Sequence, residues 1–416
     1  MKKRGFVLGL SLVSCGLIVF LSAGKKLPVE EVQVPELIAL EPIFTSLSEE
    51  KELEQDNETA PECEEPVTIV GAPVFPKTCG GDWVITASAL YWTAHQDGMD
   101  FAIRNAVRVP VVNPDPPEID ELNNLIDDDL EGPKGKWEYG FKLGLGYNTS
   151  CDGWDLDLVW THFSPRSHTD VSAGVSDNQS LVTLWSAFAP AQGEVNFARD
   201  IEANWKVDLN FVDFELGRAY WTSKRMSLRP FIGLRFLSIK QDYDLEHKGG
   251  SWSPRIDPVQ DPFTGEVSLN NDYRGVGLHS GIDSIWHFDC GWGLYGNLAA
   301  NVVYGCFDIS HKENIRLAVS PYTKTEILDA KSHFRASRAI IDLALGIQWS
   351  ALICDCQYGI LARLGWESHL FLHQNQMWRV VRIGDTANQT QGQNVFHHRR
   401  GTLDTQGITL ALEFLF

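Results

Sequence analysis

Apolar and polar residues alternate along much of the chain between Gly81 and Phe416. Side chains at every second position of a β-strand project to the same face, so this pattern predicts strands with one apolar and one polar face. The clearest example carries Trp137, Tyr139, Phe141, Leu143, Leu145 and Tyr147 on its apolar face. Ten segments share the pattern: 83–103, 137–147, 154–160, 205–220, 228–243, 273–288, 292–307, 334–349, 358–371 and 403–416. Most of them are long enough to cross a bilayer as tilted strands, which takes about 9–11 residues.

The connections between these segments alternate in length. Short ones span 148–153, 221–227, 289–291 and 350–357, and long ones span 104–135, 164–203, 244–272, 310–333 and 372–402. Such alternation is typical of a transmembrane antiparallel up-and-down β-barrel with short periplasmic turns and long outer loops. We therefore expect an all-β barrel of about 10 strands with both termini in the periplasm. Further strands within 180–203 or 377–383 would raise the number to 12 or 14.

One segment changes phase without any turn residue. Its apolar residues fall on odd positions from Trp205 to Phe211 and on even positions from Val212 to Leu216. Because an extra residue in one strand shifts every later side chain to the other face, we interpret this change as a β-bulge.

Aromatic residues support a membrane position for the barrel. Trp137, Tyr147, Trp154 and Trp160 lie near the ends of their apolar stripes, where amphipathic rings meet the two membrane interfaces. A water-soluble sandwich would also explain a single hairpin, but it offers no reason for the alternating lengths of the connections.

The first residues resemble a secretory signal. Lys2, Lys3 and Arg4 precede an apolar run that ends before Ser22, Ala23 and Gly24. We expect cleavage after Gly24. The residues Leu12–Gly16 also resemble a lipoprotein box, so the type of signal peptidase stays open. The domains expected are a signal peptide (1–24), an acidic and flexible periplasmic segment (25–80) and an outer-membrane β-barrel (81–416).

The final segment is amphipathic and ends in an aromatic residue. Ile408, Leu410, Leu412, Phe414 and Phe416 share one face. This arrangement resembles the signal that the barrel-assembly machinery of outer membranes reads, and we assign that role to Phe414 and Phe416.

Composition excludes some classes of protein. The formal net charge is −20, which argues against binding to nucleic acid because the phosphates would repel the chain. The mean hydropathy is −0.16, and beyond the signal no apolar stretch approaches the 18 or so residues expected of a membrane helix. Strands that hide one apolar face each are compatible with this low value.

Charged residues in the strands fall on the face opposite the apolar stripe, which is the lumen of a barrel. These candidates are Arg235, His279, Asp283, Arg338, Asp342, Arg363, Glu367 and His369. They form either interior salt bridges or a hydrated path for ions. A hydrolytic group of His279 with Ser280 or Asp283 is less favoured, because Ser280 points to the opposite face. The acidic stretch from Asp127 to Glu138 imitates a calcium loop but lacks flanking helices, so we expect no metal site there. We also expect no enzyme activity and no cofactor.

Cysteines gather at one predicted side of the barrel. Six of the seven that follow the signal lie in short turns or before the first strand: Cys63, Cys79, Cys151, Cys290, Cys354 and Cys356. Disulfides are permitted in the periplasm, so we expect these thiols to form them, some between molecules or with cysteine-rich envelope proteins, because seven is odd. Local bridges with some free thiols are the alternative.

The chain resembles the pore-forming outer-membrane family known from Legionella and the major-outer-membrane-protein-like family of chlamydia-related bacteria. The resemblance rests on Ala89–Trp92, Gln96–Gly98, Trp137–Gly144, Asp213–Arg218 and Leu228–Pro230. It implies an outer-membrane barrel classed as a pore, with periplasmic cysteines suited to an envelope stiffened by disulfides, and no catalytic residues.

Three functions follow as hypotheses. The first is a porin for passive diffusion of small hydrophilic solutes and ions, in which Asp155, Asp157, Asp208 and Asp283 favour cations. The second is a non-conducting structural or adhesive barrel in the lipid of the outer membrane. The third, a barrel hydrolase, is the least favoured.

Overall fold

The computed structural model describes residues 70–74, 81–106, 130–173, 179–188, 195–253, 256–354, 357–383 and 393–416. They lie in one compact unit that spans Glu65–Phe416. Among these residues no helix has the length and apolar character that a membrane crossing requires.

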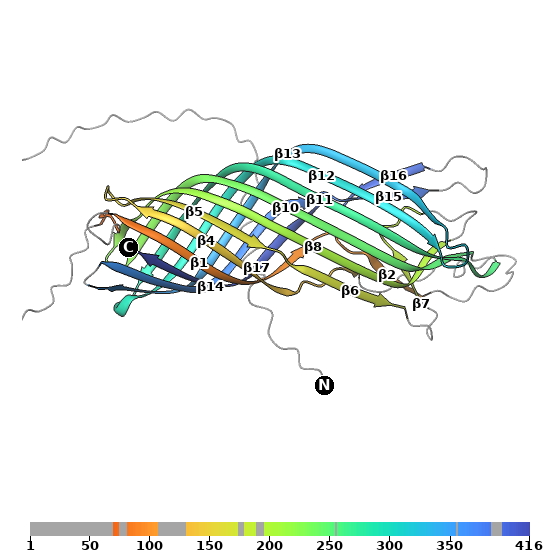
Figure 1. The fold of residues 1–416 in the computed structure, drawn as a ribbon, viewed down its shortest axis with the longest axis horizontal. Coiled ribbons are helices and arrows are strands. Elements are labelled where there is room, and N and C mark those ends of the chain that lie inside the picture. The colour runs from red at the N-terminus through yellow and green to blue at the C-terminus, as the bar shows by residue number, and fades with distance from the viewer. Residues whose placement is uncertain are drawn as a thin grey trace, which may run out of the picture. The chain divides into compact units, whose positions relative to one another are not determined.

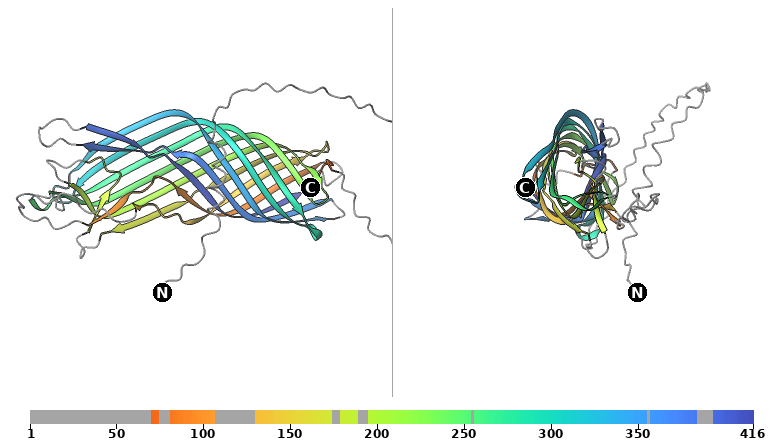
Figure 2. Two further views of the ribbon diagram at one scale, coloured as in Figure 1. Left: turned by 180° about the vertical axis from the view of Figure 1, so that it is seen from behind. Right: turned by 90° about the vertical axis from the view of Figure 1, so that its right-hand side faces the viewer.

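Ten antiparallel strands close into a ring, which confirms the expected up-and-down barrel (Figure 1). Around the ring they follow the order β8-β5-β4-β1-β17-β14-β13-β12-β11-β10, and β10 pairs again with β8. Their bounds are β1 Asp82–Gln96, β4 Trp137–Asn148, β5 Trp154–Phe163, β8 Val195–Arg218, β10 Met226–Ser253, β11 Ile256–His287, β12 Trp292–Leu317, β13 Lys324–Ile353, β14 Tyr358–Asn375 and β17 Gly401–Leu415. Figure 2 shows the closed ring in the view along the strands.

Seven shorter strands do not enlarge the ring. They are β2 Ala102–Ala106, β3 Leu130–Glu131, β6 Arg166–Ser172, β7 Gln179–Thr183, β9 Tyr220–Ser223, β15 Trp378–Ile383 and β16 Gln393–His398. β15 and β16 form a separate hairpin, and β6 and β7 pair along β8. The strands sought within 180–203 and 377–383 therefore exist, but the described ring keeps ten members.

A belt of exposed apolar side chains surrounds one part of the barrel. On β12 it runs from Trp292 to Tyr304, which are 49% and 56% exposed. At ~3.3 Å per residue and a tilt of ~40° this stretch spans about 30 Å along the barrel axis, the thickness of a bilayer's hydrocarbon core. Aromatic residues mark both edges of the belt, including Trp160 and Trp366 at one edge and Trp286 at the other.

Five strands continue far beyond this belt. β8, β10, β11, β12 and β13 have 24 to 32 residues, whereas β5 has 10. We call the part of the barrel that they build the extended end, and the opposite end, with the short turns, the turn end (Figure 1). The prediction of long loops at 244–272 and 310–333 is wrong, because most of these residues belong to β10, β11, β12 and β13. Their apolar residues sit on the inner face, where a search for a lipid-facing stripe does not find them.

The predicted β-bulge in β8 is also wrong. The pairing of β8 with β5 and β10 runs without a register shift from Phe211 to Leu216. Trp205, Val207, Leu209 and Phe211 are buried on the inner face, whereas Phe214 and Leu216 are exposed on the outer face. The strand keeps its phase and the environment changes instead: lipid lies outside the belt, and an apolar core lies inside the extended end.

Connecting segments complete this inner core. We call residues 97–101, 184–188 and 374–378 the plug segments. Their apolar side chains join the inward residues of the extended end in one buried cluster. Tyr243 donates a hydrogen bond to the carbonyl oxygen of Met99 (2.8 Å), and Trp185 donates one to that of Asp100 (2.8 Å). The interior of the extended end is therefore packed like a soluble core.

The segment before β1 contacts the turn end. The amide of Gly71 donates a hydrogen bond to the carbonyl oxygen of Trp221 (2.6 Å), and that of Val74 to Ala219 (3.1 Å). This part of the segment 25–80, which we expected to be flexible throughout, is thus attached to the barrel.

Candidate functional site: a charged lumen

A polar cavity of about 460 Å³ occupies the barrel interior at the height of the belt. Every strand of the ring contributes to its lining, because inward side chains alternate with lipid-facing ones. Eight carboxylates and four lysine or arginine side chains line it: Asp155, Asp157, Asp213, Glu215, Asp283, Asp342, Glu367, Glu413, Lys142, Arg229, Arg235 and Arg363. The lining therefore has an excess of negative groups.

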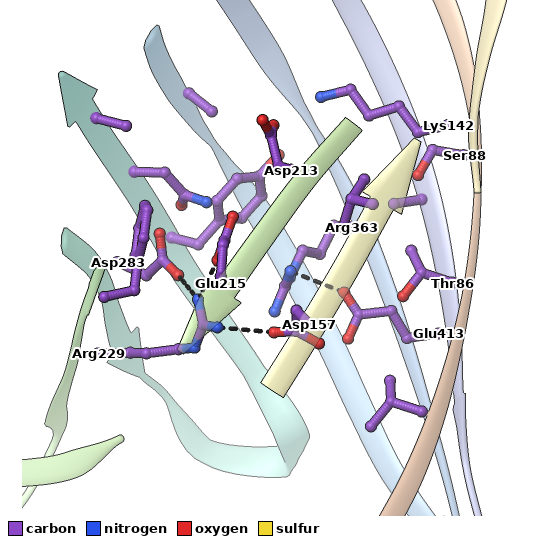
Figure 3. Close-up of a pocket in the computed structure, with 18 of the residues that line it drawn as sticks. Thr86, Ser88, Lys142, Asp157, Asp213, Glu215, Arg229, Asp283, Arg363 and Glu413 are labelled. Atoms are coloured by element: carbon purple, nitrogen blue, oxygen red, sulfur yellow. Dashed lines mark hydrogen bonds and ion pairs between the residues drawn. The ribbon is translucent and has the colours of Figure 1, made fainter. Parts of the chain in front are cut away.

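Arg229 of β10 is the centre of one network (Figure 3). Its guanidinium contacts Asp155 (2.6 Å), Asp157 (2.7 Å), Glu215 (2.9 Å) and Asp283 (2.8 Å), which come from β5, β8 and β11. One guanidinium thus contacts four carboxylates, and His279 makes a further contact to Glu215 (3.1 Å), so acidic groups outnumber basic ones in this network. The Oδ2 atom of Asp155 is buried without a protein hydrogen-bond partner, a position that a water molecule or a cation would satisfy.

Arg235, six residues further along β10, is the centre of a second network. It makes two parallel hydrogen bonds to Asp213 (2.6 and 2.7 Å) and one to Asp342 (2.7 Å). His369 also contacts Asp342 (2.7 Å), and Asn301 donates to it (2.9 Å). Each carboxylate here has a basic partner, so this network supports the structure of the barrel wall.

Two further ion pairs lie across the cavity from Arg229. Arg363 of β14 contacts Glu413 of β17 at 2.7 Å, and Lys142 of β4 pairs with Glu367 of β14. Figure 3 shows Arg363 and Glu413 facing the Arg229 network across the open interior. The lumen is thus crossed by acidic and basic groups from opposite walls.

The structure brings together seven of the eight charged candidates named from the sequence. Arg235, His279, Asp283, Asp342, Arg363, Glu367 and His369 line the cavity. Arg338 lies apart from them, over the ring of Phe307 (4.7 Å) near the extended end. The prediction that Asp208 favours cations in the lumen is wrong. Asp208 lies on the outer face of β8 beside His162 (3.9 Å), because β8 has no bulge that would turn it inward.

Several lumen residues were missed in the sequence analysis. Their odd or even position along the strand, here called parity, would have identified them. Arg229 shares its face with Arg235, and Glu215 shares its face with Asp213, since an even number of residues separates each pair. Lys142 alternates with Phe141 and Leu143 in the same way. What parity does not reveal is which carboxylates each cation contacts, because that depends on the pairing of different strands.

The alternative chemistries receive no support from the geometry. Ser280 is exposed on the outer face and donates to the carbonyl oxygen of Ala300 (3.3 Å), away from His279. Asp127 and Asp129 of the calcium-like stretch lie outside the described residues. Among those that the structure describes, no three His, Cys, Asp or Glu side chains form a group suited to a metal ion.

Three cysteines occupy turns at the turn end. Cys151, Cys290 and Cys354 are exposed, unpaired thiols, and Cys290 and Cys354 adopt positive φ angles of 59° and 53°. Cys306 is also unpaired and lies on β12 near the other edge of the belt. The remaining candidates, Cys63, Cys79 and Cys356, lie outside the described residues.

The last strand closes the ring. β17 pairs with β1 and β14, and Phe416 and Trp83 exchange two backbone hydrogen bonds (2.8 and 3.0 Å). Phe414 and Phe416 are 40% and 43% exposed on the outer face, with ring centroids 5.9 Å apart. They belong to the aromatic edge of the belt at the turn end.

Some solved structures are similar to this chain at low sequence identity. No curated protein matches the chain. Among solved structures, the outer membrane protease OmpT from Escherichia coli is similar at 9% identity and a TM-score of 0.34, over 82% of this chain and 99% of that one. A Pseudomonas aeruginosa FadL homologue is similar at 7% identity and a TM-score of 0.23, over 81% and 90%.

A family model covers most of the chain. Residues 76–416 match the model described as "Legionella pneumophila major outer membrane protein precursor". This range includes the whole ring, the belt and the charged lumen. The chain therefore belongs to the Legionella major outer membrane protein family and is an outer membrane β-barrel protein.

Proposed function

We propose that this protein is a pore-forming protein of the outer membrane, which lets small hydrophilic solutes and ions diffuse passively and favours cations. The observation that carries the proposal is the cavity at belt height, with twice as many carboxylates as lysine and arginine side chains. Acidic groups outnumber basic ones around Arg229, and these groups border a space that water can fill. Acidic groups along a hydrated path favour the passage of cations.

The plug segments close the path for ions in this conformation. In this conformation the apolar core of the extended end, including Met99, Trp185 and Met377, fills the interior beyond the cavity. Ions therefore pass only when these segments move out of the barrel. The pore we propose is a gated one, with long closed periods.

Single-channel recording tests the proposal. Refolded protein in a planar bilayer should give discrete current steps, and a salt gradient should give a reversal potential of the sign for cation preference. Currents no larger than those of an empty bilayer, also after mutation of the plug segments, would exclude a pore.

A non-conducting structural barrel is the second candidate. The observation that favours it is the same apolar core, since inward residues such as Leu209, Tyr273 and Phe307 are fully buried. This function predicts no conductance from variants with a weakened plug, whereas the gated pore predicts more frequent opening.

The orientation and the cysteines complete the proposal. We place the turn end in the periplasm, because short turns face that side in bacterial barrels. Cys151, Cys290 and Cys354 then meet an oxidising compartment and are available for disulfides to a second copy or to cysteine-rich envelope proteins. We further propose removal of residues 1–24 as a signal peptide and recognition of Phe414 and Phe416 by the barrel-assembly machinery.

A further inference from the structure

Four residues form a row across neighbouring strands on the outer face of the barrel. Arg274 of β11 pairs with Cys306 of β12, which pairs with Arg335 of β13, while Ser238 of β10 pairs with Arg274 on the other side. We call Ser238, Arg274, Cys306 and Arg335 the interface row. Residues paired in adjacent strands point to the same face, so the two arginines flank the Cys306 side chain.

The position of the row relative to the belt defines its surroundings. On β12 the last belt residue is Tyr304, and Cys306 is the next side chain on the same face. Two residues along a tilted strand raise it by about 5 Å, which is the depth of the lipid headgroups beyond the hydrocarbon. The belt ends next to the extended end at this row, so the two guanidinium groups lie at the level of lipid phosphates.

Both arginines are available for a ligand. Arg274 is exposed, and Arg335 is fully exposed, with its guanidinium beside the Cys306 thiol and the Tyr304 hydroxyl. Among the described residues, no carboxylate forms a salt bridge with either arginine. The charge of Arg274 acts on Asp272, two residues away on β11, but the interface row itself contains no carboxylate.

The nearest acids lie one row further from the bilayer. Asp272 and Asp308 are paired across β11 and β12, and His333 contacts Asp308 at 2.5 Å. The charge on this outer face thus changes from positive at the headgroup level to mixed above it. An anionic group at the headgroup level would therefore contact the two arginines and lie on the membrane side of Asp272 and Asp308.

We propose that Arg274 and Arg335 bind the phosphate groups of a phosphorylated glycolipid in the outer leaflet of the outer membrane. Guanidinium groups match phosphate oxygens with paired, charge-assisted hydrogen bonds. Tyr304 contacts the lipid just below, where an aromatic ring fits the boundary between headgroup and acyl chain. The assignment to the outer leaflet rests on the orientation proposed above; phosphate binding itself does not depend on conduction.

Native mass spectrometry of detergent-solubilised protein tests the site. The protein is incubated with lipid A that carries its phosphates, with dephosphorylated lipid A, or with phosphatidylglycerol. The double variant Arg274→Gln/Arg335→Gln is compared with Lys312→Gln/Lys331→Gln, which removes two cations from the same outer face but further from the belt. A heat-dependent gel shift shows that each variant is folded.

We expect wild type and the lysine variant to retain phosphorylated lipid A equally, and the arginine variant to lose affinity by roughly 10- to 30-fold. Equal retention by the arginine variant, or equal retention of the dephosphorylated lipid by wild type, would overturn the site. Tighter binding of phosphatidylglycerol than of lipid A would overturn the assignment to a glycolipid. If the arginine variant loses lipid binding but keeps its conductance, the lipid site is independent of the proposed pore. If wild type binds the lipid but gives no conductance, the pore proposal fails and the lipid site remains.

Discussion

Arg235 of β10 and Asp213 of β8 face each other across two paired strands and form two parallel hydrogen bonds of 2.6 and 2.7 Å. Arg235 is 2% exposed and Asp213 is 6% exposed. A bidentate pair of this kind has the geometry of the strongest ion pairs in proteins. It joins the membrane-level wall at the point where the apolar core of the extended end begins, beside Phe211.

Loss of Arg235 should strongly destabilise the barrel. Arg235→Met leaves Asp213 and Asp342 buried near each other without their cation, which should lower the free energy of unfolding by about 3–5 kcal/mol. Urea unfolding of the refolded protein in detergent measures this change. Lys312→Gln on the exposed outer face should alter stability by less than about 0.5 kcal/mol. A similar small change for Arg235→Met would show that the pair contributes little.

Cation preference should depend on Asp157. This carboxylate is one of the four around Arg229 and is still partly accessible in the cavity. Asp157→Asn should move the reversal potential in a salt gradient, recorded at pH 8, towards that of an unselective pore, because an acidic group leaves the path. Asp208→Asn removes the same charge from the outer face and should leave the potential unchanged. If both variants behave alike, selectivity does not arise in this cavity.

Opening should become more frequent when the plug is weakened. Trp185 is 1% exposed, packs edge-on against Tyr243 and donates a hydrogen bond to the carbonyl oxygen of Asp100. Trp185→Ala removes these contacts, which are worth about 3–5 kcal/mol for a buried tryptophan. Single-channel recordings should then show shorter closed times and more frequent openings. Trp286→Ala, which truncates the same side chain on the lipid face, should leave the opening frequency as it is.

Acid should loosen the extended end. Burial lowers the pKa of His247 to about 4, and that of His311, whose ring contacts that of Trp378, also to about 4. Because both folded-state pKa values lie below the ordinary value of about 6.5, the unfolded form binds more protons between pH 6.5 and 4, and stability falls as the pH drops through this window. The loss should reach about 3 kcal/mol for each histidine at pH 4.

Hydrogen exchange measures this effect. Amides of the β10–β11 and β12–β13 hairpins should lose protection at pH 5 relative to pH 7.5, after correction for intrinsic rates. The variant His247→Gln/His311→Phe should lose most of the pH dependence, whereas His95→Gln, which changes an exposed histidine, should keep it. Equal pH dependence in all three proteins would rule out the buried histidines as its cause.

Thiols at the turn end should cross-link the protein in the envelope. Whole envelopes run on gels without reductant should show bands of high molecular mass that reductant removes. Replacing Cys151, Cys290 and Cys354 with serine should reduce these bands strongly, because these thiols are exposed on turns. Cys306→Ser, at the other edge of the belt, should leave them unchanged. Migration of the wild type as a monomer without reductant would refute cross-linking.

Local alternation was sufficient to predict the ring. In β4 and β5 the exposed residues, such as Leu143 and Leu158, fall where the period of two places them, and Lys142 or Asp157 falls inside. The period of a strand is a property of its own backbone, so it needs no knowledge of neighbouring strands. The succession of the strands along the chain and the polar inner face at the height of the belt follow from it.

The environment of each face, in contrast, was decided by the tertiary structure. Leu209 and Phe214 are both apolar residues of β8, yet one packs inside a core and the other faces lipid. A strand pattern does not distinguish these two apolar environments, which is why the phase change was mistaken for a bulge and Asp208 was placed in the lumen. The contacts of Arg229 with carboxylates of β5, β8 and β11 likewise require the register of several strands at once. The sequence alone thus determined the barrel and the parity of its lumen residues, whereas only the packed ring decided where the lumen is charged and where it is filled, because register and burial are properties of strands in contact.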